Sequence, residues 1–181
     1  QQCRRMHCWL LYGRGKLVSE DVIKLEHVWK IFGENAQAAM EAIEARNLSK
    51  DQVLKEFKCV VGIADCSFSV RKGEVFCVMG LSGSGKSTMV RHLNRLIEAT
   101  AGFIEVLGKD MRALSDVDLR AMRAREIGMV FQHMALLPHR TVRDNVAFPL
   151  QIRGESKARR WDISQQCLNL VNLDGYEDRF P

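Results

Sequence analysis

Residues 80–88 read Gly80-Leu81-Ser82-Gly83-Ser84-Gly85-Lys86-Ser87-Thr88. This stretch satisfies the pattern G-x-x-x-x-G-K-[ST] of a phosphate-binding loop. Before it comes the apolar run Glu74 to Met79, which is typical of a strand buried on both faces, and after it a predicted helix over 87–97. Because a strand, the loop and a helix in this order are the context that confirms the pattern, we expect an α/β protein that binds a nucleotide.

Each residue type in the loop has a chemical task. Glycines let backbone N–H groups turn inward around a polyphosphate, and the following helix directs its positive dipole end at the same anion. We expect Lys86 to bring its charge to the β and γ phosphates, Ser87 to ligate Mg²⁺ and Thr88 to add a phosphate contact. The predicted nucleotide-binding residues of the loop are Gly80, Leu81, Ser82, Gly83, Ser84, Gly85, Lys86, Ser87 and Thr88. The loop alone does not separate GTPases, small-molecule kinases, recombinases and transport ATPases.

Composition and charge narrow the class of protein. The chain has 181 residues, of which 46% are hydrophobic and 27% charged, and no apolar run approaches the roughly 18 residues of a membrane-spanning helix. The net charge is +5, but residues 1–18 hold four basic and no acidic residues, so the rest carries only +1. That balance argues against a nucleic-acid partner. Residues 1–20 are predicted to form a disordered basic leader.

Hydrophobic patterns and capping residues predict the remaining elements. Alternation and β-forming residues indicate strands, alanine-rich and amphipathic stretches indicate helices, and Ser49 with Gln52 predicts a helix start. The predicted strands are 23–32, 60–70, 74–79, 103–106 and 127–131, and the predicted helices are 35–47, 49–57, 87–97, 115–122, 141–150 and 156–173.

Two further stretches carry a resemblance to a known family. The segment IGMVFQ (127–132), followed by HMALLPHRTVRDNVAFPLQIRG (133–154), resembles the Q-loop region of the ATPases of ABC transporters. The charged helical insert over 34–57 and the continuation MVRHLNRLIEATAG (89–102) are similar to glycine betaine/proline importer ATPases of the ProV type. The ATPases of choline, carnitine and ectoine importers stay open as alternatives.

The resemblance implies a fold and a set of roles. The fold would be a P-loop NTPase of the ABC type, with an N-terminal antiparallel β portion and the start of a helical subdomain. Residues 21–181 would be the N-terminal part of this domain, with the Q-loop at 132–140 and the helical subdomain at 141–181. Phe32 in KIFG matches the aromatic that stacks on adenine, whereas Trp29 is expected to pack. Gln132 matches the Q-loop glutamine, which contacts Mg²⁺ and the attacking water. Lys86 and Gln132 would thus be catalytic, and Ser87 and Gln132 would hold Mg²⁺.

The same resemblance implies partners and a location. The chain would work with an ABC membrane permease subunit, with a second ATPase subunit as a homodimer and, indirectly, with a substrate-binding protein. It would lie peripherally on the cytoplasmic face of the inner membrane. Met134, Leu136, Leu137 and Phe148 are candidate apolar contacts with the permease, with ordinary core packing as the alternative for each.

The chain departs from the family pattern after Gln132. It contains no L-S-G-G-Q-type signature, no strand ending in Asp-Glu and no switch histidine, so we expect a fragment that does not hydrolyse ATP alone. The leading hypothesis is a component of an ATPase that drives import of a compatible solute. The alternatives are a nucleotide-binding fragment without turnover and an ATPase of another amino-acid or osmolyte importer. A GTPase is disfavoured because no N-K-x-D motif occurs, and a kinase because no lid is found.

Overall fold

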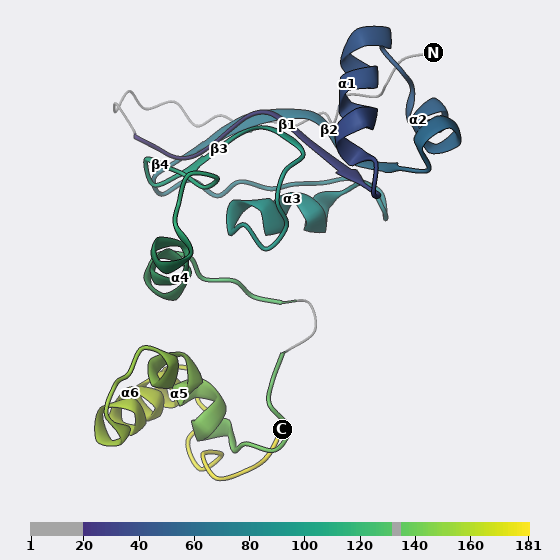
Figure 1. Ribbon diagram of the computed structural model, residues 1–181. Helices are drawn as coiled ribbons and strands as arrows, with labels where there is room; N and C mark the ends of the chain where they lie inside the picture. Colours follow the sequence, from purple (N-terminus) through teal and green to yellow (C-terminus); the bar gives the residue numbers. More distant parts are fainter. Residues whose placement is uncertain (1–19, 132–134) are drawn as a thin grey trace. The chain divides into compact units, whose positions relative to one another are not determined.

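The computed structural model describes residues 20–131 and 135–181 (Figure 1). The predicted leader, apart from Glu20, and the predicted site residue Gln132 lie outside the described residues. The chain divides into two compact units, Gln1–Leu119 and Arg120–Pro181, which are described separately. The elements are β1 (Asp21–Phe32), α1 (Ala36–Arg46), α2 (Lys50–Phe57), β2 (Val60–Arg71), α3 (Lys86–Leu93), β3 (Ala101–Val106), β4 (Lys109–Asp110), α4 (Asp116–Arg125), α5 (Val142–Ile152) and α6 (Lys157–Leu170).

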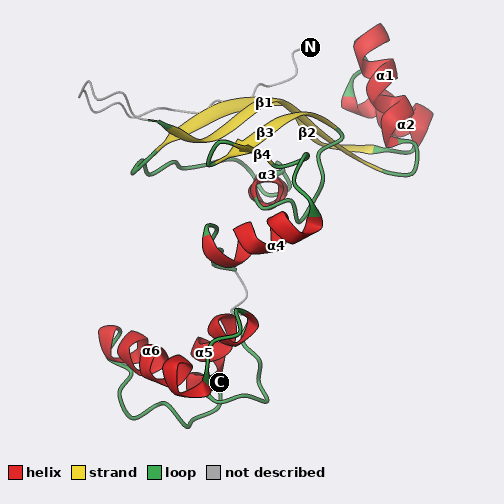
Figure 2. Ribbon diagram, turned by 60° about the vertical axis from the view of Figure 1, so that its left-hand side comes forward, coloured by secondary structure: helices red, strands yellow, loops and turns green. Residues whose placement is uncertain are grey.

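The first unit is built on a four-stranded antiparallel sheet in the order β2-β1-β3-β4 (Figure 2). The sheet confirms the predicted strands over 23–32, 60–70 and 103–106. β1 lies between β2 and β3, and its side chains Leu25, Val28 and Ile31 are at most 1% exposed. β-Branched and long aliphatic residues suit this position because the pleated backbone lets them pack against neighbours on the sheet surface. α3 lies against the sheet in both ribbon views.

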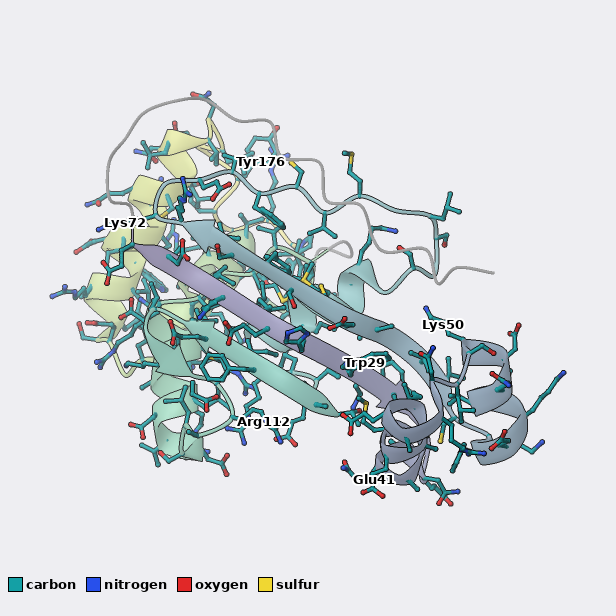
Figure 3. The ribbon with its side chains drawn as sticks, turned by 90° about the horizontal axis from the view of Figure 1, so that it is seen from above. Trp29, Glu41, Lys50, Lys72, Arg112 and Tyr176 are labelled. Atoms are coloured by element: carbon teal, nitrogen blue, oxygen red, sulfur yellow. The ribbon has the colours of Figure 1, made fainter. Side chains whose placement is uncertain are left out.

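The predicted insert over 34–57 forms α1 and α2, which connect β1 to β2 at one end of the sheet. The predicted capping box is present, because the Ser49 hydroxyl accepts from the Gln52 N–H and the Gln52 side chain accepts from the Ser49 N–H. Seen from above, Trp29 lies near this end of the sheet and Lys72 at the opposite end (Figure 3). One hydrophobic cluster joins the helices to the strands: Ile31, Ala39, Met40, Ile43, Val53, Cys59 and Val61.

Two predicted strands are wrong. Residues 74–79 and 127–131 have no regular secondary structure, and none of their side chains is fully buried, with Val75 90% and Val130 98% exposed. A strand exists through hydrogen bonds to a neighbour, and no described residue pairs with either segment in the sheet. Apolar composition shows that a segment favours a buried strand, but it does not show that a neighbouring strand is present to form hydrogen bonds with it. The predicted helix over 87–97 is also shorter, because regular helix ends at Leu93.

The second unit contains the helix pair α5 and α6, close to the predicted ranges. Each begins with a side-chain cap, Thr141 for α5 and Ser156 for α6. The chain after α6 returns to the start of α5, where the Val142 N–H donates to the Arg179 carbonyl oxygen at 2.8 Å. No helix within 20–131 or 135–181 is long and apolar enough to cross a membrane.

Candidate nucleotide-binding site

The phosphate-binding loop runs directly into α3, as the pattern predicts. The first hydrogen bond of the helix is from the Met89 N–H to the Gly85 carbonyl oxygen, at 2.8 Å. The N–H groups of Lys86, Ser87 and Thr88 find no acceptor in the described part of the chain, and no side chain caps the helix. Three donors and the positive end of the helix dipole are therefore left available for an anion.

One glycine of the loop is required by geometry. Gly85 has φ +91°, and a Cβ atom there would lie 2.5 Å from the Gly62 carbonyl oxygen. Any other residue would be strained in conformation and would also meet a backbone atom that cannot move aside. A Cβ atom on Gly80 would lie 2.6 Å from the Ser84 hydroxyl oxygen. That hydroxyl group can rotate aside, so Gly85 is the position at which the contacts leave no room for a side chain.

Lys86 folds its ammonium group back over the loop. Nζ donates to the carbonyl oxygens of Gly80 at 2.8 Å and Leu81 at 2.7 Å, and lies 3.5 Å from the Ser84 hydroxyl oxygen. An ammonium group has three donors and no acceptor, so it is held wherever oxygens gather. The contacts place the charge inside the curve of the loop, where oxygens of a polyphosphate would be further acceptors.

Ser87 and Thr88 differ in their surroundings. Ser87 is exposed in the first turn of α3, and its hydroxyl makes no hydrogen bond to any described residue. A free hydroxyl oxygen beside an anion site is the hard donor that Mg²⁺ prefers, so the residue fits the predicted metal role. Thr88 is partly buried, and its carbonyl oxygen accepts from His92 Nδ1 at 2.6 Å.

The predicted adenine-stacking residue Phe32 lies at the end of β1 and is 40% exposed. Its ring lies over Gly62 of β2, because a Cβ atom there would approach Phe32 Cε2 to 2.6 Å. The carbonyl group of the same glycine meets Gly85 of the loop. Gly62 therefore brings the exposed ring and the phosphate-binding loop together. Trp29 packs against the hydrophobic cluster of the insert, as expected for the rival aromatic.

His92 lies behind the loop in α3 and is 1% exposed. Burial lowers the pKa of its imidazole, a hydrogen bond to the Thr88 carbonyl oxygen opposes this effect, and the positive charge of Lys30 lowers the pKa further. A buried histidine that bonds the backbone of its own helix contributes to the packing of that helix.

Sequence reasoning missed two residues, one in each unit. Gly62 carries no motif, and only the register of β1 with β2 brings it under Phe32 and beside Gly85. Asn145 belongs to the Thr-Val-x-x-Asn-Val stretch, but this pattern does not say what the Asn145 side chain does. Its side-chain oxygen accepts from the Leu137 N–H, and its nitrogen donates to the carbonyl oxygens of Leu137, Arg140 and Thr141.

Comparison with known proteins gives the family. Residues 63–181 match the protein family described as ABC transporter. The chain belongs to the ABC transporter family. Membership of this family implies that the domain binds a nucleotide.

The relatives within the ABC transporter family are transport ATP-binding proteins. The chain is 44% identical over 159 residues to the glycine betaine/proline betaine transport system ATP-binding protein ProV of Escherichia coli. It is 45% identical over 164 residues to the trimethylamine N-oxide transport system ATP-binding protein TmoW of Pelagibacter ubique. These alignments cover 88% and 91% of the chain, which spans only 40% and 48% of the two relatives.

Solved structures confirm the fold of an ATP-binding cassette. The dimeric post-hydrolysis structure of the ATP-binding cassette MJ0796 bound to ADP and Pi superposes with a TM-score of 0.68 at 25% sequence identity. The match covers 88% of this chain and 61% of that one. The predicted fold class, an ABC-type P-loop NTPase with an antiparallel β portion, is therefore confirmed.

Proposed function

We propose that this chain belongs to an ATP-binding and ATP-hydrolysing subunit that powers import of a compatible solute, such as glycine betaine, proline or a similar quaternary amine. One observation carries the proposal most directly. The loop has Lys86 turned inward and three free N–H groups, which suit a polyphosphate. An exposed aromatic ring, which suits a flat base, adjoins this loop through Gly62. These are the two parts of ATP.

In the proposed site, each group acts on a different part of MgATP. Adenine stacks on Phe32, and the N–H groups of α3 with Lys86 hold the phosphates. The Ser87 hydroxyl and Gln132 would hold Mg²⁺, which would neutralise charge on the phosphate oxygens. A neutral carboxamide such as that of Gln132 can also orient the attacking water, because it both accepts and donates hydrogen bonds.

The nature of the relatives supports a quaternary amine or a similar osmolyte as the solute. The chain aligns with the glycine betaine and trimethylamine N-oxide transport proteins over 159 and 164 residues. It aligns with the methionine import ATP-binding protein MetN of Halalkalibacterium halodurans over 138 residues, at 45% identity. The longer match favours the osmolyte class, and an amino-acid importer is the second candidate.

The proposed partners follow from the same reading. They are an ABC membrane permease, a second ATPase subunit and, indirectly, a substrate-binding protein, at the cytoplasmic face of the inner membrane. The dimeric state of the similar cassette MJ0796 supports a homodimer. Among the candidate permease contacts, Leu136 is 46% exposed, whereas Phe148 is partly buried beneath the Arg140 guanidinium group. Leu137 is partly buried, and Met134 lies outside the described residues.

Replacing Phe32 with alanine is expected to weaken ATP binding roughly 5- to 150-fold and to leave inorganic triphosphate binding unchanged. The reason is that base stacking contributes about 1–3 kcal/mol and acts on adenine alone. Competition against a fluorescent ATP analogue measures both affinities. Phe32→Tyr, which keeps the ring, is the control and should bind ATP normally. An equal loss of both ligands would show that Phe32 only supports the local structure.

Transport in cells tests the function as a whole. The protein that contains this chain is expressed with its permease in cells that lack other betaine importers. Uptake of labelled glycine betaine is expected at high osmolarity, and a Lys86→Ala variant should abolish it. Uptake of methionine in place of glycine betaine would support the second candidate, and uptake of neither solute would contradict the proposed import of this class.

A further inference from the structure

Lys30 is a cation on β1, the strand that also carries Phe32, and no sequence motif identifies it. It precedes Phe32 by two residues on β1, so both side chains leave the same face of the strand. Trp29 and Ile31 pack into the cluster of the insert, which directs Lys30 and Phe32 to the other face. There the Lys30 ammonium nitrogen lies 5.2 Å from the centroid of the Phe32 ring.

Lys30 lies beside one of the two anchors of the proposed nucleotide, and that anchor adjoins the other. The Phe32 ring is one anchor, and the first turn of α3 is the other. Lys30 reaches the first through its cation–π contact. The second anchor begins at Gly85, which meets the Gly62 carbonyl oxygen, and Gly62 lies under the same Phe32 ring. The charge of Lys30 also acts on α3, because it adds to the larger effect of burial in lowering the pKa of His92 in the last turn of that helix.

The cation–π contact is one that a nucleotide could replace. A cation over a partly exposed ring gains only about 0.5–1 kcal/mol, and adenine would need a face of the same ring. A phosphate oxygen offers the displaced ammonium group a charge-assisted hydrogen bond, which is stronger than a contact with a neutral group. If the base lies on Phe32 and the β and γ phosphates lie at Lys86, the α-phosphate is the part of ATP that is left for Lys30.

We propose that Lys30 is a second nucleotide-binding cation, which leaves the Phe32 ring for the α-phosphate when adenine stacks there. The inference rests on the proposed ATP site and assigns the third part of the ligand to a side chain. Lys86 serves the β and γ phosphates, Phe32 the base and Lys30 the phosphate between them.

Binding of AMP separates Lys30 from Lys86, because AMP carries only the α-phosphate. Lys30→Met keeps the length of the side chain and removes its charge. This variant is expected to bind AMP about tenfold more weakly than the unmodified protein, and Lys30→Arg should recover most of the loss. Adenosine, which has no phosphate, should bind Lys30→Met no more weakly than the unmodified protein. Isothermal titration and competition with a fluorescent ATP analogue measure these affinities.

Lys24→Met is the matched control, since Lys24 is a half-exposed lysine of the same strand that pairs with Glu26 at 2.8 Å. It should bind AMP normally. Unchanged AMP affinity in Lys30→Met, together with normal ATP binding by the unmodified protein, would overturn this inference alone. An equal loss of adenosine and AMP would also overturn it, because Lys30 would then only position the ring. No ATP binding by the unmodified protein would overturn the proposed function and the inference with it.

Discussion

Lys86→Ala is expected to abolish detectable ATP binding in a chain that remains folded. Lys86 is the cation that the loop itself encloses, and its Nζ already lies within 2.8 Å of two loop carbonyl oxygens. Removing one partner of a desolvated charge pair costs roughly 2–5 kcal/mol. Lys86 is expected to face two phosphate groups, so the affinity should fall below the range of a fluorescence titration with an ATP analogue.

The control for this variant is Lys72→Ala. Lys72 is an exposed cation in the turn after β2, at the other end of the sheet from the insert (Figure 3). This variant changes net charge by the same amount and should bind ATP normally, which separates a local contact from a general loss of positive charge. Unchanged ATP affinity in Lys86→Ala, with a normal circular dichroism spectrum, would refute the assignment of 80–88 as the phosphate-binding loop.

Gly85→Ala is expected to have the second large effect, a loss of at least about 100-fold in ATP affinity together with lower thermal stability. A positive φ costs an alanine about 1–2 kcal/mol, and the added methyl group would also lie 2.5 Å from the Gly62 carbonyl oxygen. The backbone has to move to relieve this contact. Movement at Gly85 displaces the first N–H groups of α3, which are the donors for the phosphates.

Gly73→Ala is a matched control for the conformational strain. Gly73 has φ +79°, but a Cβ atom there would meet nothing within 4 Å, and the residue lies outside the loop. This variant should lower the melting temperature, because alanine pays the same cost for a positive φ as it does at position 85. It should leave the ATP affinity unchanged. If both variants bound ATP equally well, the contact between Gly85 and Gly62 would have no part in shaping the site.

Part of the fold could be predicted because it depends on neighbours along the chain. The capping box of Ser49 and Gln52 joins residues three positions apart, and the alternation of β1 is a property of consecutive residues. The loop pattern belongs to this class too, since the Lys86 ammonium group bonds the carbonyl oxygens of Gly80 and Leu81, five and six residues before it. Interactions between residues this close in the chain can be predicted from the sequence.

The failures arose where a partner is remote in sequence. Residues 74–79 have the composition of a buried strand, yet Val75 and Met79 are 90% and 69% exposed, because strand formation requires hydrogen bonds that the segment cannot make with itself. The meeting of Phe32, Gly62 and Gly85 was equally out of reach, since it follows from the register of two strands and the path of the loop beside them.

The sequence by itself therefore determined the loop that leads into α3, the capping box of α2, the strands β1, β2 and β3 and the family. Only the tertiary structure decided that Gly62 links the exposed ring to the loop and that Lys30 stands over that ring. The physical reason is that motifs and caps are made by local hydrogen bonds and backbone preferences. A composite site, in contrast, is made by side chains and carbonyl groups that only the pairing of distant segments brings within contact.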